Sequence, residues 1–121
     1  MFRINVKREF DAAHFLCNTE TKCDQIHGHR WTVVATFTST QLTKSGWVIN
    51  FTTAKKWIDA VLEEFDHNIL NFYLPQPTAE NLCLCLWRAL AGHVTTYRET
   101  GSDLKLEKVE IYETPNNSAS F

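Results

Sequence analysis

Polar and apolar side chains alternate almost regularly along residues 2–14. The apolar members other than Ala13 lie with His14 on one face of an extended chain, and the charged members other than Arg8 lie on the opposite face. A period of two over this length predicts a β-strand with one buried face. A second alternation, from about His27 to Thr38, predicts a second strand after a polar loop.

Apolar side chains recur at helical spacing later in the chain. From Ala54 to Phe65 they fall three or four residues apart, which predicts an amphipathic helix with a single apolar stripe. The start of this helix could be capped by the side chain of Asn50, Thr52 or Thr53.

A second helix is expected to begin after Thr78, because threonine is a favoured N-cap and leucines follow at helical spacing. Gly92 or Gly101 could end this helical region. A short extended piece is expected at 47–51, and strand character returns at 104–112. The polar tail that follows has room for one more short strand.

The predicted order is therefore two strands, two helices, and one or two further strands. This order indicates the α+β class, with an antiparallel sheet that carries both helices on one face. A chain of 121 residues allows a single domain over residues 1–121.

Composition and charge narrow the class of protein. Hydrophobic residues make up 44% and charged residues 21%, which excludes a disordered chain. The 12 basic and 14 acidic residues leave a net charge of −2, so no nucleic-acid partner is expected. No apolar run approaches the roughly 20 residues that span a bilayer, so no membrane association is expected. The first residues lack the apolar core of a secretory signal, so we expect a cytoplasmic protein whose cysteines are thiols.

His27-Gly28-His29 is the most informative tripeptide of the sequence. Residues i and i+2 of a strand point to one side, so both imidazoles can reach one metal ion. His14 has the matching parity on the first strand, and pairing of the two strands would bring it beside them. A lone strand histidine is more often a packed or surface residue. Three histidines that leave a fourth position open are typical of catalytic zinc.

Cys23 lies four residues before His27. A zinc ion bound nearby would lower the pKa of its thiol, and the resulting thiolate could act as a base. An alternative is a structural Cys₂His₂ site formed by Cys17, Cys23, His27 and His29, which would leave His14 unused.

Two further features could carry acid–base or binding chemistry. Asp66-His67 follows the first helix, and an aspartate that orients a histidine is a common general acid–base unit. A surface loop or a helix C-cap explains this dipeptide equally well. Glu113 ends the last predicted strand, where a carboxylate is usually solvated.

Five segments, spread in order over the chain, carry a combined pattern. They are Phe10-Asp11-Ala12-Ala13-His14, Cys23-x-x-x-His27-Gly28-His29, Asp66-His67-Asn68-x-Leu70-Asn71, Pro77-Thr78-Ala79-Glu80-Asn81 and Glu113-Thr114-Pro115. Together they resemble the 6-pyruvoyltetrahydropterin synthase family, and most closely its bacterial 6-carboxytetrahydropterin synthase branch. The short gap between Cys23 and His27 is similar to that branch. Asn50 departs from the family, which usually has aspartate before this phenylalanine.

The resemblance implies a tunnelling fold, in which subunits join their antiparallel sheets into a barrel. The barrels then stack as a homohexamer, a dimer of trimers. The resemblance also implies that His14, His27 and His29 bind Zn²⁺.

The resemblance further implies roles in catalysis and substrate binding. Cys23, together with the Asp66-His67 pair, would move protons. Glu113 would anchor the pterin ring, and Glu80 stands at a family position near the pterin pocket, although a place in the first turn of a helix is sufficient to explain it.

The implied reaction converts 7,8-dihydroneopterin triphosphate to 6-carboxy-5,6,7,8-tetrahydropterin, with release of acetaldehyde and triphosphate, in queuosine (7-deazapurine) biosynthesis. The expected partner is therefore a small-molecule pterin, and no redox cofactor is required because hydrogens are redistributed within the substrate. One alternative is a 6-pyruvoyltetrahydropterin synthase, which eliminates triphosphate without cleaving the side chain. Another is a zinc-binding module without catalysis.

Overall fold

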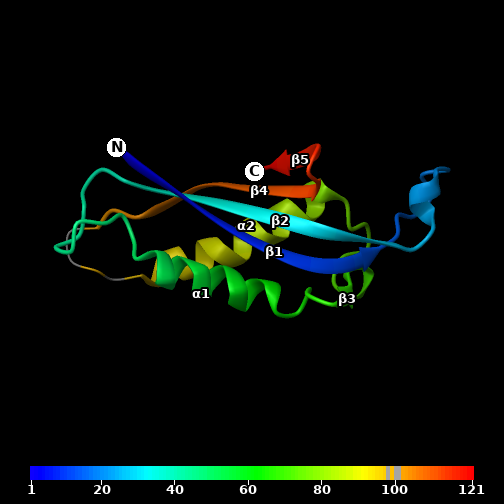
Figure 1. The fold of residues 1–121 in the computed structure, drawn as a ribbon, viewed down its shortest axis with the longest axis horizontal. Helices are drawn as coiled ribbons and strands as arrows, with labels where there is room; N and C mark the ends of the chain where they lie inside the picture. Colours follow the sequence, from blue (N-terminus) through cyan, green and yellow to red (C-terminus); the bar gives the residue numbers. More distant parts are fainter. Residues whose placement is uncertain (98, 100–101) are drawn as a thin grey trace.

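Residues 1–97, 99 and 102–121 are described by a computed structural model of the chain. They form a five-stranded sheet of order β3-β1-β2-β4-β5, with both helices on one of its faces (Figure 1). The elements are β1 (Phe2–His14), β2 (His27–Ser39), α1 (Phe51–Leu62), β3 (Asn68–Ile69), α2 (Ala79–Thr96), β4 (Lys105–Thr114) and β5 (Asn117–Ser120), with 3-10 turns at Lys22–Asp24 and Leu70–Phe72. The predicted α+β class is confirmed. In the described part of the chain, no helix combines the length and apolar character needed to cross a bilayer.

β1 and β2 pair antiparallel along their whole length, which sets His14 opposite His27. Their alternating patterns are in phase, so the apolar side chains of both strands meet on one face. Phe10 lies opposite Trp31, and their rings stack with centroids 6.2 Å apart. The other strands join this pair, with β3 beside β1 and β4 beside β2.

The two helices cover the apolar face of the sheet. The buried side chains are Ala54, Ile58 and Leu62 on α1, Leu82, Cys83, Leu86 and Leu90 on α2, and Trp31, Val33, Ala35, Phe37, Val109 and Ile111 on the central strands. Full burial of one large apolar side chain stabilises a fold by about 1.5–3 kcal/mol, so this interface is the main source of stability. Arg8, the charged side chain that β1 places on this face, reaches the rim, where its Nε lies 2.7 Å from Asp59 of α1.

Of the three candidate caps of the first helix, the structure selects Asn50, and the predicted cap Thr78 of the second helix is confirmed. The side chain of Asn50 accepts a hydrogen bond from the backbone N–H of Thr52 (2.8 Å), and Thr78 accepts one from the N–H of Asn81 (3.2 Å). A side-chain oxygen is sufficient for this role, so Asn50 caps α1 without the charge of an aspartate.

The expected end of the second helix is wrong at Gly92. α2 continues to Thr96, and the other expected end, Gly101, lies outside the described residues. A glycine inside a helix costs roughly 1 kcal/mol relative to alanine. Leu90 is buried and Val94 packs against the core, so apolar contacts on both sides of the glycine offset this cost.

One other local expectation differs from the structure, and the structure adds one strand that the sequence did not predict. The segment 47–51 is not a strand, because Val48 and Ile49 are buried within an irregular loop that leads into α1. The loop after α1 contains β3, which pairs in parallel with the end of β1. A strand of two residues is too short to show an alternating pattern, so only its pairing reveals it.

The carboxylate of Asp103 ties the chain before β4 to the end of β2. It accepts hydrogen bonds from the Ser39 hydroxyl, from the backbone N–H of Thr40 (2.8 Å) and from the Thr40 hydroxyl (2.5 Å). These donors, the Ser39 hydroxyl first, hold the pKa of Asp103 well below the ordinary range of an aspartate. Folding therefore favours the ionised form.

Asp103→Asn is expected to lower the free energy of unfolding near neutral pH, because the amide cannot accept all of these bonds. A carboxyl whose pKa is depressed by folding stabilises the fold above its unfolded pKa of about 3.9, and this contribution is lost as the pH falls through the folded pKa. Urea unfolding at about pH 7 and about pH 3 should show a deficit that shrinks in acid. The control Glu63→Gln, at the exposed C-cap of α1, should change little. An equal deficit at both pH values would contradict this account.

Candidate active site

Three histidines converge at one end of the sheet. His14 is the last residue of β1, and His27 and His29 lie at the start of β2. Strand alternation sends all three side chains to the helix-covered face. The ring centroids are 4.5 Å apart for His14 and His27, 5.4 Å for His14 and His29, and 4.9 Å for His27 and His29. One nitrogen of each ring lies within 4.8 Å of the others, so a single ion can contact all three.

Backbone carbonyls orient two of these rings. Nδ1 of His14 lies 2.7 Å from the carbonyl oxygen of Pro77, and Nδ1 of His27 lies 2.7 Å from that of Gln25. A carbonyl can only accept, so each Nδ1 donates, and the neutral ring keeps its lone pair on Nε2. Hydrogen bonds of this kind fix the tautomer and the direction of histidines that bind metals.

The Nε2 atoms of His14 and His29 are buried and have no hydrogen-bond partner among the described residues. An unpartnered buried polar atom costs roughly 1–3 kcal/mol, so these atoms indicate a place for a ligand. Burial also lowers the pKa of His14, which favours the neutral form that binds metals. Trp31 lines the inner side, with its ring centroid 5.0 Å from that of His14. This donor set fits a zinc ion with three nitrogen ligands and a fourth position for water or substrate.

Glu113 lies beside the histidines rather than free in solvent. It stands near the end of β4, and its side chain is 28% exposed. Its Oε1 lies 3.5 Å from Nε2 of His29, and its Oε2 lies 3.8 Å from Nε2 of His14. The structure therefore brings this carboxylate to the three nitrogens, where it can contact whatever binds there.

Cys23 lies in the loop between β1 and β2 and is partly buried. Its carbonyl accepts a hydrogen bond from the N–H of Leu16 (2.8 Å). Within the described chain, neither its sulfur nor that of the exposed Cys17 belongs to the group of converging ligand atoms. His14, and not the two cysteines, thus joins the other two histidines, which disfavours the Cys₂His₂ alternative.

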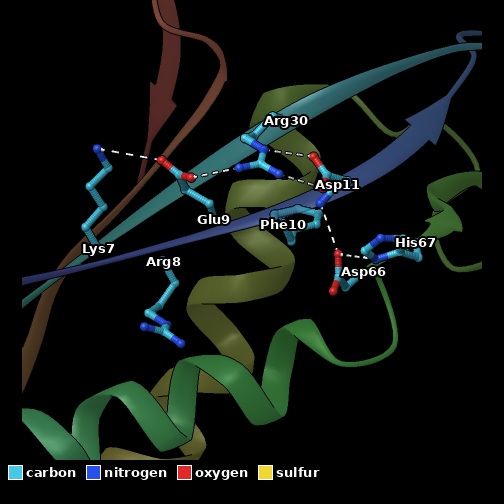
Figure 2. Close-up of a pocket in the computed structure, with 8 residues that line it drawn as sticks. All are labelled: Lys7, Arg8, Glu9, Phe10, Asp11, Arg30, Asp66 and His67. Carbon is cyan, nitrogen blue, oxygen red and sulfur yellow. Dashed lines mark hydrogen bonds and ion pairs between the residues drawn. The ribbon is translucent and has the colours of Figure 1, made fainter.

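Asp66 and His67 form a second cluster (Figure 2). Nδ1 of His67 lies 2.9 Å from Oδ1 of Asp66, and the same oxygen accepts a hydrogen bond from the N–H of Asp11 (3.0 Å). The bond from Asp11, together with the nearby imidazole, lowers the pKa of Asp66 and favours its ionised form. His67 has a φ of +58°, in the left-handed region, and its N–H donates to the Asp11 carbonyl (2.6 Å). β1 therefore holds the pair in a locally strained conformation.

The two clusters lie on opposite faces of the sheet. Asp11 has the opposite parity to His14 in β1, and its carboxylate accepts two hydrogen bonds of 3.1 Å from Arg30 of β2. A ring nitrogen of His67 lies within 4.8 Å of carboxylate oxygens of Asp11 and Asp66. These side chains line a surface cavity of about 480 Å³ (Figure 2). Within one chain, the ligand atoms of Asp66 and His67 and those of the three histidines therefore form two separate groups.

Other contributors to the site are hard to identify from residue types. Glu80 is exposed in the first turn of α2, where the helix dipole stabilises negative charge. Backbone groups orient several of these side chains. The carbonyls of Pro77 and Gln25 accept hydrogen bonds from His14 and His27, respectively. The peptide groups of Asp11 bind Asp66 and His67, and the sequence predicts none of these contacts. Every residue carries a backbone carbonyl, so residue type does not identify these contacts. The sequence marks Asp11 and Pro77 only by their places in two of the motifs.

Known proteins share both the sequence pattern and the fold of this chain. The sequence profile described as 6-pyruvoyl tetrahydropterin synthase matches residues 3–121. A putative 6-carboxy-5,6,7,8-tetrahydropterin synthase from Archaeoglobus fulgidus is 34% identical over 88 residues, which cover 73% of this chain and 75% of that protein. A 6-carboxy-5,6,7,8-tetrahydropterin synthase from Rickettsia felis is 29% identical over 140 residues, with 96% of each protein covered.

Two further relatives extend the comparison. A dihydroneopterin monophosphate aldolase from Pyrococcus furiosus is 30% identical over 111 residues, which cover 92% of this chain and 89% of that protein. The solved structure of Caenorhabditis elegans 6-pyruvoyl tetrahydropterin synthase superposes with a TM-score of 0.78 at 25% identity, covering 100% of this chain and 96% of that one. The chain therefore has the tunnelling fold and belongs to the 6-pyruvoyl tetrahydropterin synthase family of enzymes.

Proposed function

We propose that the protein is a zinc-dependent 6-carboxy-5,6,7,8-tetrahydropterin synthase. It converts 7,8-dihydroneopterin triphosphate and water to 6-carboxytetrahydropterin, acetaldehyde and triphosphate, in queuosine biosynthesis in the cytoplasm. The observation that carries this proposal is the convergence of three histidine nitrogens, two of them buried and without a hydrogen-bond partner among the described residues. Relatives of that name that align over nearly the whole chain support it.

His14, His27 and His29 are the proposed zinc ligands. When bound, zinc supplies Lewis acidity that acidifies the side-chain hydroxyls of the substrate and the adjacent C–H bond. The Pro77 and Gln25 carbonyls keep the ligand nitrogens aimed at the ion through the Nδ1 hydrogen bonds.

Cys23 is the proposed base that removes a proton from the substrate side chain. His67 moves a proton on the other side, and Asp66 holds its Nδ1 so that Nε2 is the atom that exchanges protons. The depressed pKa of Asp66 supports this role, because an ionised carboxylate stabilises the imidazolium that forms.

Glu113 and Glu80 are the proposed carboxylates that bind the pterin. The 2-amino group and the adjacent ring N–H of a pterin can donate two hydrogen bonds to one carboxylate. Glu113 has the stronger support, because it already lies against the histidines, whereas Glu80 is exposed on α2.

The complete site is proposed to form between copies of the chain. His67 must approach the substrate held by the histidines, but a single chain keeps these groups on opposite faces of its sheet. In a homo-oligomer, which we propose to be the hexamer of the tunnelling fold, the Asp66-His67 pair of one copy would serve the histidines of another.

Product analysis tests the proposed reaction. Incubation with dihydroneopterin triphosphate should release acetaldehyde in equal amount to 6-carboxytetrahydropterin, measured by coupled reduction of the aldehyde and by mass spectrometry. Accumulation of 6-pyruvoyltetrahydropterin without acetaldehyde would favour the pyruvoyl synthase instead. A phosphorylated aldehyde with a hydroxymethyl pterin would indicate aldol cleavage, the reaction class named for the Pyrococcus relative.

Metal analysis tests the proposed ligands. The purified protein should hold about one zinc ion per chain, with nitrogen and oxygen but no sulfur ligands in X-ray absorption. His29→Ala should lose most of the metal, whereas the matched control Cys17→Ala should retain it. Two sulfur ligands would instead support the Cys₂His₂ site and a zinc module without catalysis.

Subunit mixing tests the shared site. Cys23→Ala and His67→Ala should each be inactive, and co-assembly of equal amounts should restore about a quarter of wild-type activity, because random assembly pairs an intact Cys23 with an intact His67 at one site in four. The control mixture of Asp66→Ala with His67→Ala should gain nothing, since both changes damage the same half of the site. No recovery in the first mixture, with subunit exchange verified, would place both residues in one chain's site.

A further inference from the structure

Two side-chain amides hold the segment that follows His14. Oδ1 of Asn71 accepts from the N–H of Phe15 (3.0 Å), and its Nδ2 donates to the Phe15 carbonyl (2.8 Å). Gln76 binds the backbone of Cys17 in the same way. Its Oε1 accepts from the Cys17 N–H (2.8 Å), and its Nε2 donates to the Cys17 carbonyl (3.1 Å). Each amide thus pairs with both backbone groups of one residue, as a neighbouring strand would. We call Asn71 and Gln76 the amide clamp.

The amide clamp is linked to Cys23 through one residue. The clamp holds Phe15 and Cys17, the two neighbours of Leu16 in the chain. The N–H of Leu16 donates to the carbonyl of Cys23 (2.8 Å). With both neighbours of Leu16 held by the clamp, this bond gives the Cys23 backbone a defined place.

The segment that carries Gln76 also orients a histidine of the metal site. The carbonyl of the next residue, Pro77, accepts the hydrogen bond from Nδ1 of His14. The carbonyl of Gln76 accepts a hydrogen bond from Nδ2 of Asn81 in the first turn of α2 (2.8 Å), and Thr78 caps that helix. The Cys23 loop and His14 therefore share one support, which is tied to α2.

Packing of the fold does not account for the amide clamp. Among the described residues, none from 15 to 26 belongs to the buried core or to the side chains packed against it. Cys17, which makes two of the four clamp bonds, is exposed. Asn71 stands in the Asp66-His67-Asn68-x-Leu70-Asn71 motif, yet the proposed chemistry assigns it no part. Four directed hydrogen bonds on a loop outside the core are better explained by the geometry of what the loop carries.

We propose that Asn71 and Gln76 are positioning residues that set the distance between Cys23 and the histidine site. The inference rests on the proposed role of Cys23 as the base. A displacement of about 1 Å between a base and the reacting atoms can cost roughly a hundredfold in rate. Because both residues act on the backbone of the loop, their loss moves the base and leaves the metal ligands in place.

Isosteric variants test this role. Asn71→Asp and Gln76→Glu keep the accepting oxygen but replace the donating NH₂ by an oxygen that repels the backbone carbonyl. Each is expected to lower kcat roughly tenfold to a hundredfold, while KM, the zinc content and the thermal midpoint remain close to wild type. Gln76→Met, which removes both bonds without adding charge, should lower kcat in the same way.

Two controls separate positioning from other effects. Asn18→Asp makes the same chemical change as Asn71→Asp at an exposed site of the same loop and should leave kcat within about twofold of wild type. Adding Asn71→Asp to Cys23→Ala should cause no further loss of the residual rate, because residues that act as a unit are not additive.

The possible outcomes distinguish a failure of the amide clamp proposal from a failure of the proposed role of Cys23 as the base. Full kcat in Asn71→Asp and Gln76→Met, with Cys23→Ala inactive, would overturn the clamp and leave the proposed base intact. Activity retained in Cys23→Ala would overturn the role of Cys23 itself. Equal losses in Asn18→Asp and Asn71→Asp, or a clamp variant that loses zinc along with kcat, would also overturn the clamp, since added charge or collapse of the site would then explain the effect.

Discussion

The antiparallel register of β1 and β2 is the constraint on which both chemical clusters depend. It sets His14 opposite His27, so that these rings and His29 converge on one face, and it sets Asp11 opposite Arg30 on the other. A slip of one residue would exchange the faces of every side chain in the moving strand. The buried face, with Trp31 fully enclosed, makes such a slip costly, and packing therefore specifies the geometry of the site.

The histidine site lies where the core ends. Trp31 follows His29 on the same face, and its ring packs at an angle of 83° to that of His29, with centroids 5.6 Å apart. Burial lowers the pKa of His14 and favours its neutral form, and the carbonyls at Nδ1 of His14 and His27 leave Nε2 of these rings for a ligand. Burial and hydrogen bonding thus act together to orient the histidines that we propose as metal ligands.

The sheet separates the two kinds of chemistry. Its helix-covered face carries the nitrogens and Glu113, and its open face carries the Asp66-His67 pair beside Asp11 and Arg30. A two-residue strand, β3, holds that pair at the edge of β1. Cys23 belongs to neither face, because its loop extends beyond the sheet, and hydrogen bonds rather than apolar packing give this loop its shape. This separation is the reason for proposing a homo-oligomer, in which another copy would present its open face to the histidines.

The sequence by itself determined the features that repeat locally. Alternation over residues 2–14 revealed β1 and the parity of His14, the apolar stripe from Ala54 revealed α1, and Asn50 and Thr78 marked the helix starts. These signals depend on side-chain type at a fixed period, which the chain carries without reference to its fold.

Only the tertiary structure decided what depends on pairing between distant segments. The convergence of Glu113 on the histidines, the separation of His67 from them, the existence of β3 and the clamp of Asn71 on Phe15 all join residues far apart in the chain. Several of the hydrogen-bond partners in these contacts are backbone carbonyls and N–H groups. Nearly every residue possesses such groups, so they cannot be predicted from residue type. The physical reason is that a periodic pattern reports which face a side chain occupies, whereas the neighbour across that face is set by how the whole chain packs.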